Sequence, residues 1–446
     1  MLGIIGIILA VSLFVFMAIK GYNMILGAIL ATIVMVVCNG LPIYETVMGT
    51  YVAAEGAQAA GFMTFMAGFI KSYLLLFVLS SLLGRIMADG GAARRIALSA
   101  AKLVNNASEA NKKFACAALV PVLYFILSYV GISGFVLVFT IMPIAKELFE
   151  STDTPWRMYC FGGPQAVGAT FLVGSLQAGN IYASDVCGTT TMAGVLPSLI
   201  AIAVWIIVTI FLLRFMLKKS VAKGEGFLTD GAAIKASASA AQLPDEQLPN
   251  FWLSILPLVL VIVLSAAFKV PVIPALLYSC ILAILLFWKN ISKTLKSTLT
   301  NGITSCFGAV FTVAATFAMG SVIKILPAFG SIMTAFNALP GLLGGVGLTV
   351  LSAFIMASAS SNIAAFGSTI LESFTNAGLE NGVAHRLMTI NGFSCMGPHN
   401  AGIANATAVT KIQYKRCLTV YMLATWVPGG CAAIVTVALA ALGVFG

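Results

Sequence analysis

Long runs of apolar residues, repeated along the whole chain, constrain its fold more than any other feature. The runs are about 16 to 25 residues long, the length that an α-helix needs to cross the hydrocarbon core of a bilayer. They give a chain that is 60% hydrophobic and 9% charged over 446 residues, whereas a soluble domain carries roughly 25% charged residues. We therefore expect an all-α polytopic membrane protein without a separate soluble catalytic domain.

The apolar runs predict about 12 to 14 transmembrane segments. Their expected bounds are 2–19, 24–39, 61–84, 114–130, 131–146, 160–181, 190–213, 251–268, 272–288, 302–323, 340–357, 359–378, 387–410 and 417–445.

Basic residues gather between these runs and indicate the topology. Lys and Arg cluster in 85–113, 214–235, 289–296 and 411–416, whereas the 40–60 segment has two Glu and no basic residue. Because cytoplasmic loops carry the excess of Lys and Arg, both termini are predicted to lie outside. The net charge of +10 is thus explained by topology and does not point to nucleic acid. The nine Cys are single and apolar in setting, so no metal site is predicted.

A polar stretch divides the chain into a first membrane repeat (1–217), a cytoplasmic linker (218–250) and a second membrane repeat (251–446). Seven candidate spans lie on each side of the linker. Since seven is odd, the second half enters the membrane in the opposite orientation, which is the topology of an inverted repeat. Short matches agree with this: Trp156-Arg157-Met158 followed by Gly162 resembles His385-Arg386-Leu387 followed by Gly392. Gly84-Arg85-Ile86 before Gly91 similarly resembles Ile323-Lys324-Ile325 before Gly330.

Two segments at corresponding places interrupt the apolar pattern, 128–134 and 358–362 with its continuation to 367–369. Backbone that leaves a helix inside a bilayer must be buried in protein or line a wet cavity. Helix N-termini at such re-entrant or broken helices offer free N–H groups, and neutral side chains add donors suited to a carboxylate. The candidate substrate-binding residues here are Ser133, Ser360, Ser361 and Asn362. The alternative is that Gly and Ser only allow close helix packing.

A second pair of polar stretches follows the breaks. The first contains Asn180, and the second contains His399 and Asn400 between Pro398 and Gly402. Pro398 removes a backbone donor and Gly402 relaxes the chain, so an interrupted helix is expected there. These three polar residues join the candidate substrate site, although His399 can also be a neutral histidine satisfied within the core.

Three charged residues are further candidates. Lys71 lies about ten residues into its predicted span, where a charge needs a partner such as the substrate or Glu372. Asp185 and Glu372 are the acids nearest the polar breaks, and either can carry a coupling proton if burial raises its pKa. The alternatives are a structural ion pair for Lys71 and exposed loop positions for the two acids.

These residues together resemble the gluconate permease family, which belongs to a larger superfamily of ion transporters. The resemblance rests on residues 84–97 (Gly-Arg-Ile-Met-Ala-Asp-Gly-Gly-Ala-Ala-Arg-Arg-Ile-Ala), on Ser358–Ser361, on His385-Arg386 and on Pro398-His399-Asn400. Where the family usually has Gly after the last of these motifs, this chain has Ala401. Asn362 in the serine segment and Lys71 are also departures from the family pattern.

The resemblance implies a proton-coupled symporter for a small hydroxycarboxylate such as gluconate or β-hydroxybutyrate. It implies alternating access by two inverted repeats in a homodimer, in a bacterial inner membrane with periplasmic termini. No cofactor is expected beyond the coupling ion, H+ with Na+ as the alternative.

Other classes of function remain open at this point. A sodium/proton antiporter or a channel needs buried acids, and a di- or tricarboxylate transporter is a near alternative in substrate. An intramembrane serine protease is a remote one, because Gly131-Ile132-Ser133-Gly134 and His399 offer a Ser and a His. No GxxxxGK[ST] loop is present, so a gradient is expected to drive transport and no enzyme activity is predicted.

Overall fold

The computed structural model describes residues 2–52, 58–103, 108–129, 131–237, 243–266, 268, 270–331 and 341–445. In chain order its helices are α1 (Leu2–Ile19), α2 (Met24–Cys38), α3 (Ile43–Met48), α4 (Phe62–Asp89), α5 (Ala92–Leu103), α6 (Glu109–Tyr129), α7 (Gly134–Ser151), η1 (Trp156–Phe161), α8 (Gln165–Phe171), α9 (Ala178–Cys187), α10 (Val195–Ala222), α11 (Phe227–Ser237), η2 (Asp245–Gln247), α12 (Phe251–Ala266), α13 (Val272–Leu286), α14 (Trp288–Ile291), η3 (Ser292–Thr294), α15 (Leu295–Thr304), α16 (Phe307–Val322), η4 (Ile323–Ile325), α18 (Gly341–Met356), α19 (Ala359–Asn376), α20 (Asn381–Asn391), η5 (Gly392–Cys395), α21 (Ala401–Thr410) and α22 (Tyr414–Ala441).

The described chain is helical throughout and has the apolar lengths of a membrane protein. Six helical stretches are long and apolar enough to cross a bilayer: α1, α4, α6, α10, α22 and the run Trp288–Ile325. Shorter apolar helices cover α2, Phe251–Leu264, α13 and α18. Among the described residues, the β-structure is one isolated bridge between Tyr51 and Ala60. The prediction of an all-α polytopic membrane protein is confirmed.

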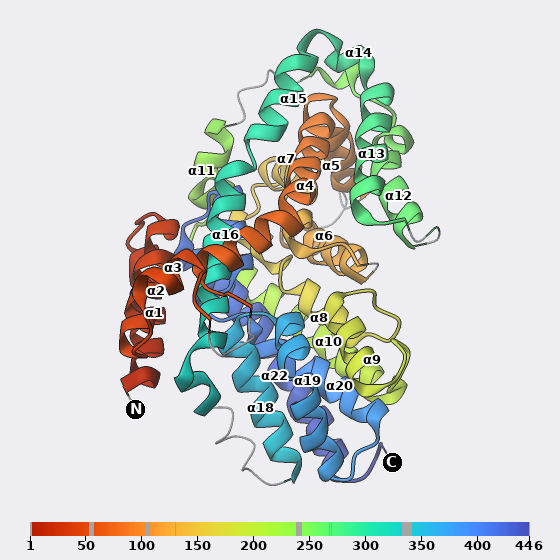
Figure 1. Ribbon diagram of the computed structural model, residues 1–446. Coiled ribbons are helices and arrows are strands. Elements are labelled where there is room, and N and C mark those ends of the chain that lie inside the picture. Colours follow the sequence, from red (N-terminus) through yellow and green to blue (C-terminus); the bar gives the residue numbers. More distant parts are fainter. Residues whose placement is uncertain are drawn as a thin grey trace.

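Two outer helical hairpins flank a central bundle. The α1–α2 hairpin packs on α16, and the α12–α13 hairpin packs on α4. Each outer hairpin therefore packs against a helix from the other half of the chain. Figure 1 shows the two hairpins at different edges of the molecule. Helices α10 and α22, each 28 residues long, pack along one another.

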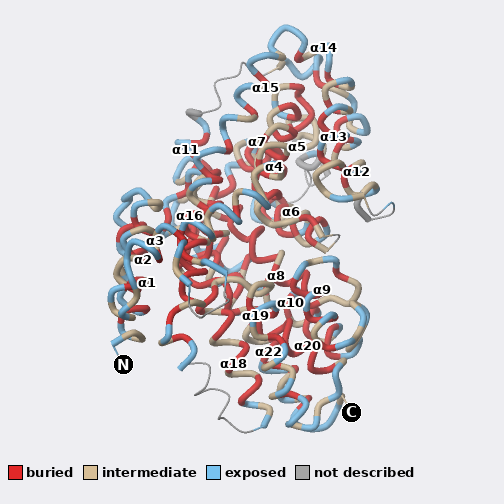
Figure 2. Tube along the Cα trace, in the orientation of Figure 1, coloured by how far each residue is buried: buried red, intermediate tan, exposed pale blue. Residues whose placement is uncertain are grey.

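The outer helices carry large apolar side chains on their exposed faces, while the centre is closely packed. Phe211 on α10 is 70% exposed, and Trp252 on α12 is 72% exposed. By contrast, Trp205 on α10 and Tyr124 on α6 are fully buried. Figure 2 shows buried residues concentrated in the middle of the bundle. Such an apolar exterior is costly in water and favourable against lipid tails.

The stretch predicted as a linker is partly helical and docks on the bundle. Helix α10 continues to Ala222, and α11 packs on η1 and α7. Phe227 at the start of α11 is buried against Trp156, with ring centroids 5.6 Å apart. Its backbone N–H donates to Oδ1 of Asp153 over 2.9 Å. The sequence did not predict this helix because 218–250 has little apolar periodicity, and the docking is made by single apolar residues.

The end of the same stretch is held by two arginines of α5. Arg94 pairs with Asp245 at 2.8 Å, and Arg95 donates through Nε to the carbonyl of Pro249 at 2.8 Å. The stretch thus packs on η1 and α7 through α11, and its end is bound by α5. The division of the chain at 218–250 stays a prediction.

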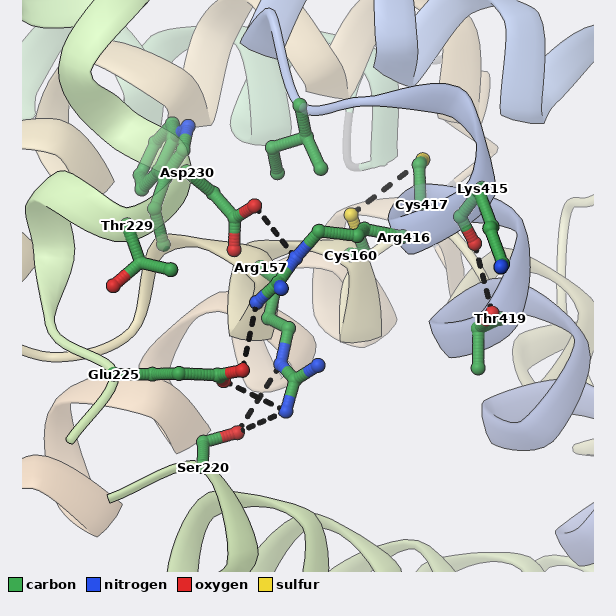
Figure 3. A network of polar contacts seen from close by, with 12 residues as sticks. Arg157, Cys160, Ser220, Glu225, Thr229, Asp230, Lys415, Arg416, Cys417 and Thr419 are labelled. Carbon is green, nitrogen blue, oxygen red and sulfur yellow. Dashed lines mark hydrogen bonds and ion pairs between the residues drawn. The ribbon is translucent and has the colours of Figure 1, made fainter. Parts of the chain in front are cut away.

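An ionic network joins the beginning of this stretch to both halves of the chain (Figure 3). Glu225 forms ion pairs with Arg157 at 2.8 Å and with Arg416 at 3.1 Å, and Arg416 forms a further ion pair with Asp230 at 2.6 Å. Beside it, the Sγ atoms of Cys160 and Cys417 lie 3.5 Å apart. One carboxylate therefore links η1 of the first half to α22 of the second.

Candidate functional site

The first helix break separates α6 from α7. Helix α6 ends at Tyr129 and α7 begins at Gly134, with Ser133 as the N-cap whose Oγ accepts from the N–H of Phe135. Val130 lies outside the described residues. The side chain of Gln177 closes this break, because its Nε2 donates to the carbonyls of Ser128 at 2.6 Å and Ile132 at 3.1 Å.

The second break separates α18 from α19 and is smaller than expected. Helix α18 ends at Met356, Ala357 has a positive φ of 48°, and Ser358 caps α19 by accepting from the N–H of Ser361 at 3.2 Å. Residues 367–369, expected to belong to the interruption, lie inside the continuous helix α19. Gly and Ser within a helix do not break it when the backbone bonds are intact, so the interruption is confined to 357–358.

Two further interruptions follow, one in each half. Helix α8 ends at Phe171 and α9 begins at Ala178, while η5 ends at Cys395 and α21 begins at Ala401. The second interruption was predicted from Pro398 and Gly402. Asn400 is the N-cap of α21, where its Oδ1 accepts from the N–H of Gly402 at 2.7 Å.

The two kinds of break are tied together in the same way in both halves. In the first half, the residue before α9, Gln177, donates to carbonyls of the α6–α7 break. In the second half, the residue before α21, Asn400, donates through Nδ2 to the carbonyl of Ala357 at 2.7 Å. An amide side chain therefore satisfies backbone acceptors that each break would otherwise leave unpaired in the bilayer interior.

The N-termini of four helices meet in two pairs, each with one helix from each half. A Cβ built on Gly179 of α9 would lie 4.0 Å from Cα of Ser360 on α19, and one on Gly367 would meet Val186. The second contact lies seven residues after the first on both helices, from Gly179 to Val186 on α9 and from Ser360 to Gly367 on α19. The two helices therefore run parallel, with adjacent N-termini. In the other pair, Asn405 of α21 donates to the carbonyl of Phe135 in the first turn of α7 at 3.1 Å.

The predicted site residues fall into three groups. Ser133, Ser360 and Ser361 are half-buried at the helix N-termini. Asn362, His399, Asn400 and Asn180 are buried. Lys71, Asp185 and Glu372 are exposed, and Lys71 and Glu372 are in none of the ion pairs formed by the described residues.

The amide oxygen of Asn180 is directed to Arg386 and His385 and not to the helix N-termini. That Oδ1 accepts from Arg386 at 2.8 Å, and it lies 2.8 Å from Nε2 of His385. Arg386 is fully buried and donates its other N–H groups to the carbonyls of Ala193 and Thr191. The sequence located Arg386 as part of a motif, but not as the buried cation that holds Asn180, because its partners are 193 to 206 positions away.

Several buried polar atoms close to the breaks have no hydrogen-bond partner in the part of the chain that the structure describes. They are Oγ of Ser128, Oδ1 of Asn362, Oδ1 of Asn405 and Nδ1 of His399. Each belongs to a residue within about one or two turns of a break. A buried unpaired polar atom costs about 1–3 kcal/mol, so each of these four atoms is a position where water or a polar ligand could bind.

The described residues contain no group of three His, Cys, Asp or Glu side chains able to hold a metal ion. The donors near the helix N-termini are hydroxyls, amides and backbone N–H groups. Such a set suits an oxygen-rich anion better than a cation.

Fold and comparison together define a polytopic helical membrane protein of the transporter class. The chain is 26% identical to the "Uncharacterized transporter YxjC" of Bacillus subtilis (strain 168) over 461 residues, which cover 92% of this chain and 93% of that protein. No protein-family model matches the chain. The similarity extends over nearly the full length of both proteins, so it includes both halves and all four helix interruptions.

Proposed function

We propose that this transporter is a secondary active, proton-coupled symporter for a small organic hydroxycarboxylate such as gluconate or β-hydroxybutyrate. The observation that carries the proposal is that α7, α9, α19 and α21 each begin at a helix interruption and are linked to one another by contacts at or near their N-termini. The substrate carboxylate binds there, and alternating access exposes it first to one side of the membrane and then to the other.

The electrostatics of this arrangement favour binding of an anion even though the site contains no positively charged side chain among the described residues. The N-terminus of a helix carries roughly half a positive charge, and its first N–H groups are free to donate. Helices α7 and α19 have 18 residues, and α9 and α21 have 10, enough for at least two turns behind each N-terminus. Ser133, Ser360 and Ser361 add hydroxyls that can bind both the carboxylate and the hydroxyl groups of a hydroxy acid.

The similar construction of the two halves supports alternating access by inverted repeats. In each half an amide side chain before a short helix holds the preceding break, Gln177 in one and Asn400 in the other. Each half then ends in a 28-residue helix. Two such units, inserted in opposite directions, can exchange conformations and so present one central site to either side in turn. We further propose a homodimer in the bacterial inner membrane with both termini in the periplasm.

A sodium/proton antiporter is less well supported, because antiporters use buried acids as ion ligands. The half-buried acids of the described chain pair with Arg or Lys side chains, as Glu150 and Glu225 do. Asp185 and Glu372, the acids nearest the breaks, are exposed.

Transport by purified protein in liposomes tests the proposal. Uptake of labelled gluconate, β-hydroxybutyrate, lactate, citrate and succinate is measured with a pH gradient and a Na+ gradient imposed separately. We expect accumulation of a hydroxymonocarboxylate driven by an inward proton gradient and abolished by a protonophore. Movement of none of these anions, or accumulation driven by Na+ alone, would contradict the proposed symport.

A further inference from the structure

His399 combines deep burial with one ring nitrogen that has no partner. Its side chain is 1% exposed, and its Nε2 lies 2.9 Å from the carbonyl oxygen of Ile355. A carbonyl only accepts, so Nε2 carries the hydrogen and Nδ1 keeps a free lone pair. Nδ1 has no hydrogen-bond partner among the described residues. The ring is held in place by Phe354, whose ring lies edge-on with centroids 5.7 Å apart.

We propose that Nδ1 of His399 is the proton-binding site that couples proton movement to anion movement. This inference rests on the proposed function and adds the residue that carries the coupling. The step is a reversible protonation: a proton adds to the lone pair of Nδ1 to give an imidazolium on one side of the membrane. It leaves from the same nitrogen on the other side, and no covalent bond of the substrate changes.

The surroundings of His399 make its protonation unfavourable while the site is empty. The residue directly precedes Asn400, the N-cap of α21, and a positive charge beside a helix N-terminus is repelled by the helix dipole. Burial of the ring also removes water that would stabilise the charge.

No carboxylate in the described elements around His399 compensates for this cost. Helices α16, α18, α21 and α22 and η5 contain no Asp or Glu. Nearby titratable groups are Cys395, which ends η5, Tyr414 of α22, which donates to the carbonyl of Pro398, and Lys324 of η4, one turn beyond Gly320. A Cβ at Gly320 would lie 4.0 Å from Cδ2 of His399. A bound anion at the helix N-termini supplies the negative charge that these described elements lack.

The two binding events are therefore linked. An anion at the N-terminus of α21 stabilises the imidazolium, and by thermodynamic reciprocity the imidazolium raises the affinity for the anion by the same factor. The doubly loaded and the empty states are favoured over either singly loaded state. A transporter that changes conformation mainly in those two states moves one proton with each anion.

The variant His399→Gln tests this inference. A Gln side chain retains an N–H donor for the carbonyl of Ile355 but has no basic nitrogen. The matched control is His385→Gln, which changes the other histidine of the chain. Both ring nitrogens of His385 already have partners, Oγ1 of Thr189 and Oδ1 of Asn180, each at 2.8 Å.

Three measurements are made on wild type and both variants in liposomes: gluconate exchange without gradients, accumulation under an inward proton gradient, and gluconate affinity at about pH 8 and about pH 5.5. For wild type we expect affinity to be about tenfold higher at the lower pH, within the usual range of coupling between two sites. His399→Gln is expected to lose accumulation driven by the proton gradient and to lose the pH dependence of affinity. His385→Gln is expected to keep both pH effects.

The outcomes separate the inference from the proposed function. If His399→Gln accumulates gluconate under a proton gradient as wild type does, the inference is wrong while the anion site stands. If wild-type accumulation ignores the proton gradient, the inference and the proton coupling of the proposed function both fail, and only the anion site stands. If wild type moves none of the tested anions, the proposed function itself fails, and the proton site fails with it. If His399→Gln loses exchange as well, with an unchanged melting temperature, His399 acts in anion binding and the inference is overturned.

Discussion

The guanidinium of Arg386 donates a hydrogen bond to the side-chain oxygen of Asn180 over 2.8 Å, although the residues are 206 positions apart. Arg386 belongs to α20 and Asn180 to α9, so this bond joins the two halves of the chain. Arg386 is fully buried, and its hydrogen-bond acceptors among the described residues are the oxygens of Asn180, Thr191 and Ala193, none of which is a carboxylate. A planar guanidinium reaches all three at once, which an ammonium group cannot do.

We expect Asn180→Ala to destabilise the protein by about 2–4 kcal/mol, because it leaves donors of Arg386 and His385 unpaired in a buried place. Asn180→Asp restores an acceptor and supplies the negative charge that Arg386 lacks, so it should lose much less stability. Thermal unfolding of the purified variants in detergent measures both effects. Equal melting temperatures for wild type and Asn180→Ala would show that Asn180 does not hold this cluster.

Ser360 tests the anion site itself. Its Oγ lies at the N-terminus of α19, and loss of one hydrogen bond to a charged ligand costs about 1.5–3 kcal/mol, or roughly tenfold or more in affinity. We expect Ser360→Ala to raise the apparent KM for gluconate uptake by that factor. Ser368→Ala, on an exposed position of the same helix, is the control and should transport normally. An unchanged KM for Ser360→Ala would exclude this hydroxyl from the site.

The membrane architecture followed from the sequence because lipid imposes it directly. A run such as 2–19 has one stable structure in a bilayer, and α1 has these same bounds. The break before α7 was predictable because Gly131, Ser133 and Gly134 interrupt an apolar pattern and Ser is a favoured N-cap. Pro398 likewise predicted the interruption before α21.

What the sequence could not supply was the partner of each polar group. Asn180 was predicted to bind substrate because it is polar in an apolar setting, but its oxygen is occupied by Arg386 and His385. Lys71 was predicted to need a partner because of its depth in a span, and its side chain is exposed on α4 outside the ion pairs of the described residues. Both outcomes depend on which helix face meets which neighbour. That is fixed by contacts between distant segments and leaves no local pattern.

The bridge made by Glu225 should be energetically cooperative. Its carboxylate binds Arg157 and Arg416 together, and its side chain is 13% exposed. We expect Glu225→Gln and Arg416→Gln each to lower the free energy of unfolding by about 1–2 kcal/mol, with a coupling above about 0.5 kcal/mol in the double variant. Unfolding in mixed detergent micelles provides the double-mutant cycle. Strictly additive effects would mean that the two side chains do not interact measurably.

Glu150 gives the protein an acid-sensitive contribution to stability. Burial alone would raise its pKa, but the hydrogen bond from Lys235 and the charge of Lys146 outweigh it and lower the pKa below 4.5. A carboxyl whose pKa is lowered on folding stabilises the protein above its unfolded pKa, and loses this effect as pH falls through the folded pKa. Glu150→Gln should therefore cost about 1 kcal/mol at neutral pH and almost nothing in strong acid. The exposed Glu246→Gln is the control, and a loss that grows on acidification would refute the assignment.

Asp230 should behave in the opposite way despite its 2.6 Å contact with Arg416. Burial raises the pKa of this carboxyl above 3.8, and the attraction of Arg416 offsets that only in part. A carboxyl whose pKa is raised on folding favours the folded state most below its unfolded pKa, and loses that contribution as pH rises through the folded pKa. At neutral pH the desolvation of ionised Asp230 thus destabilises the folded state by more than its ion pair with Arg416 stabilises it. We expect Asp230→Asn to change the melting temperature less than Glu150→Gln does at neutral pH, and to become relatively more costly in acid. A large loss of stability at neutral pH would show that the pair with Arg416 outweighs the cost of burial.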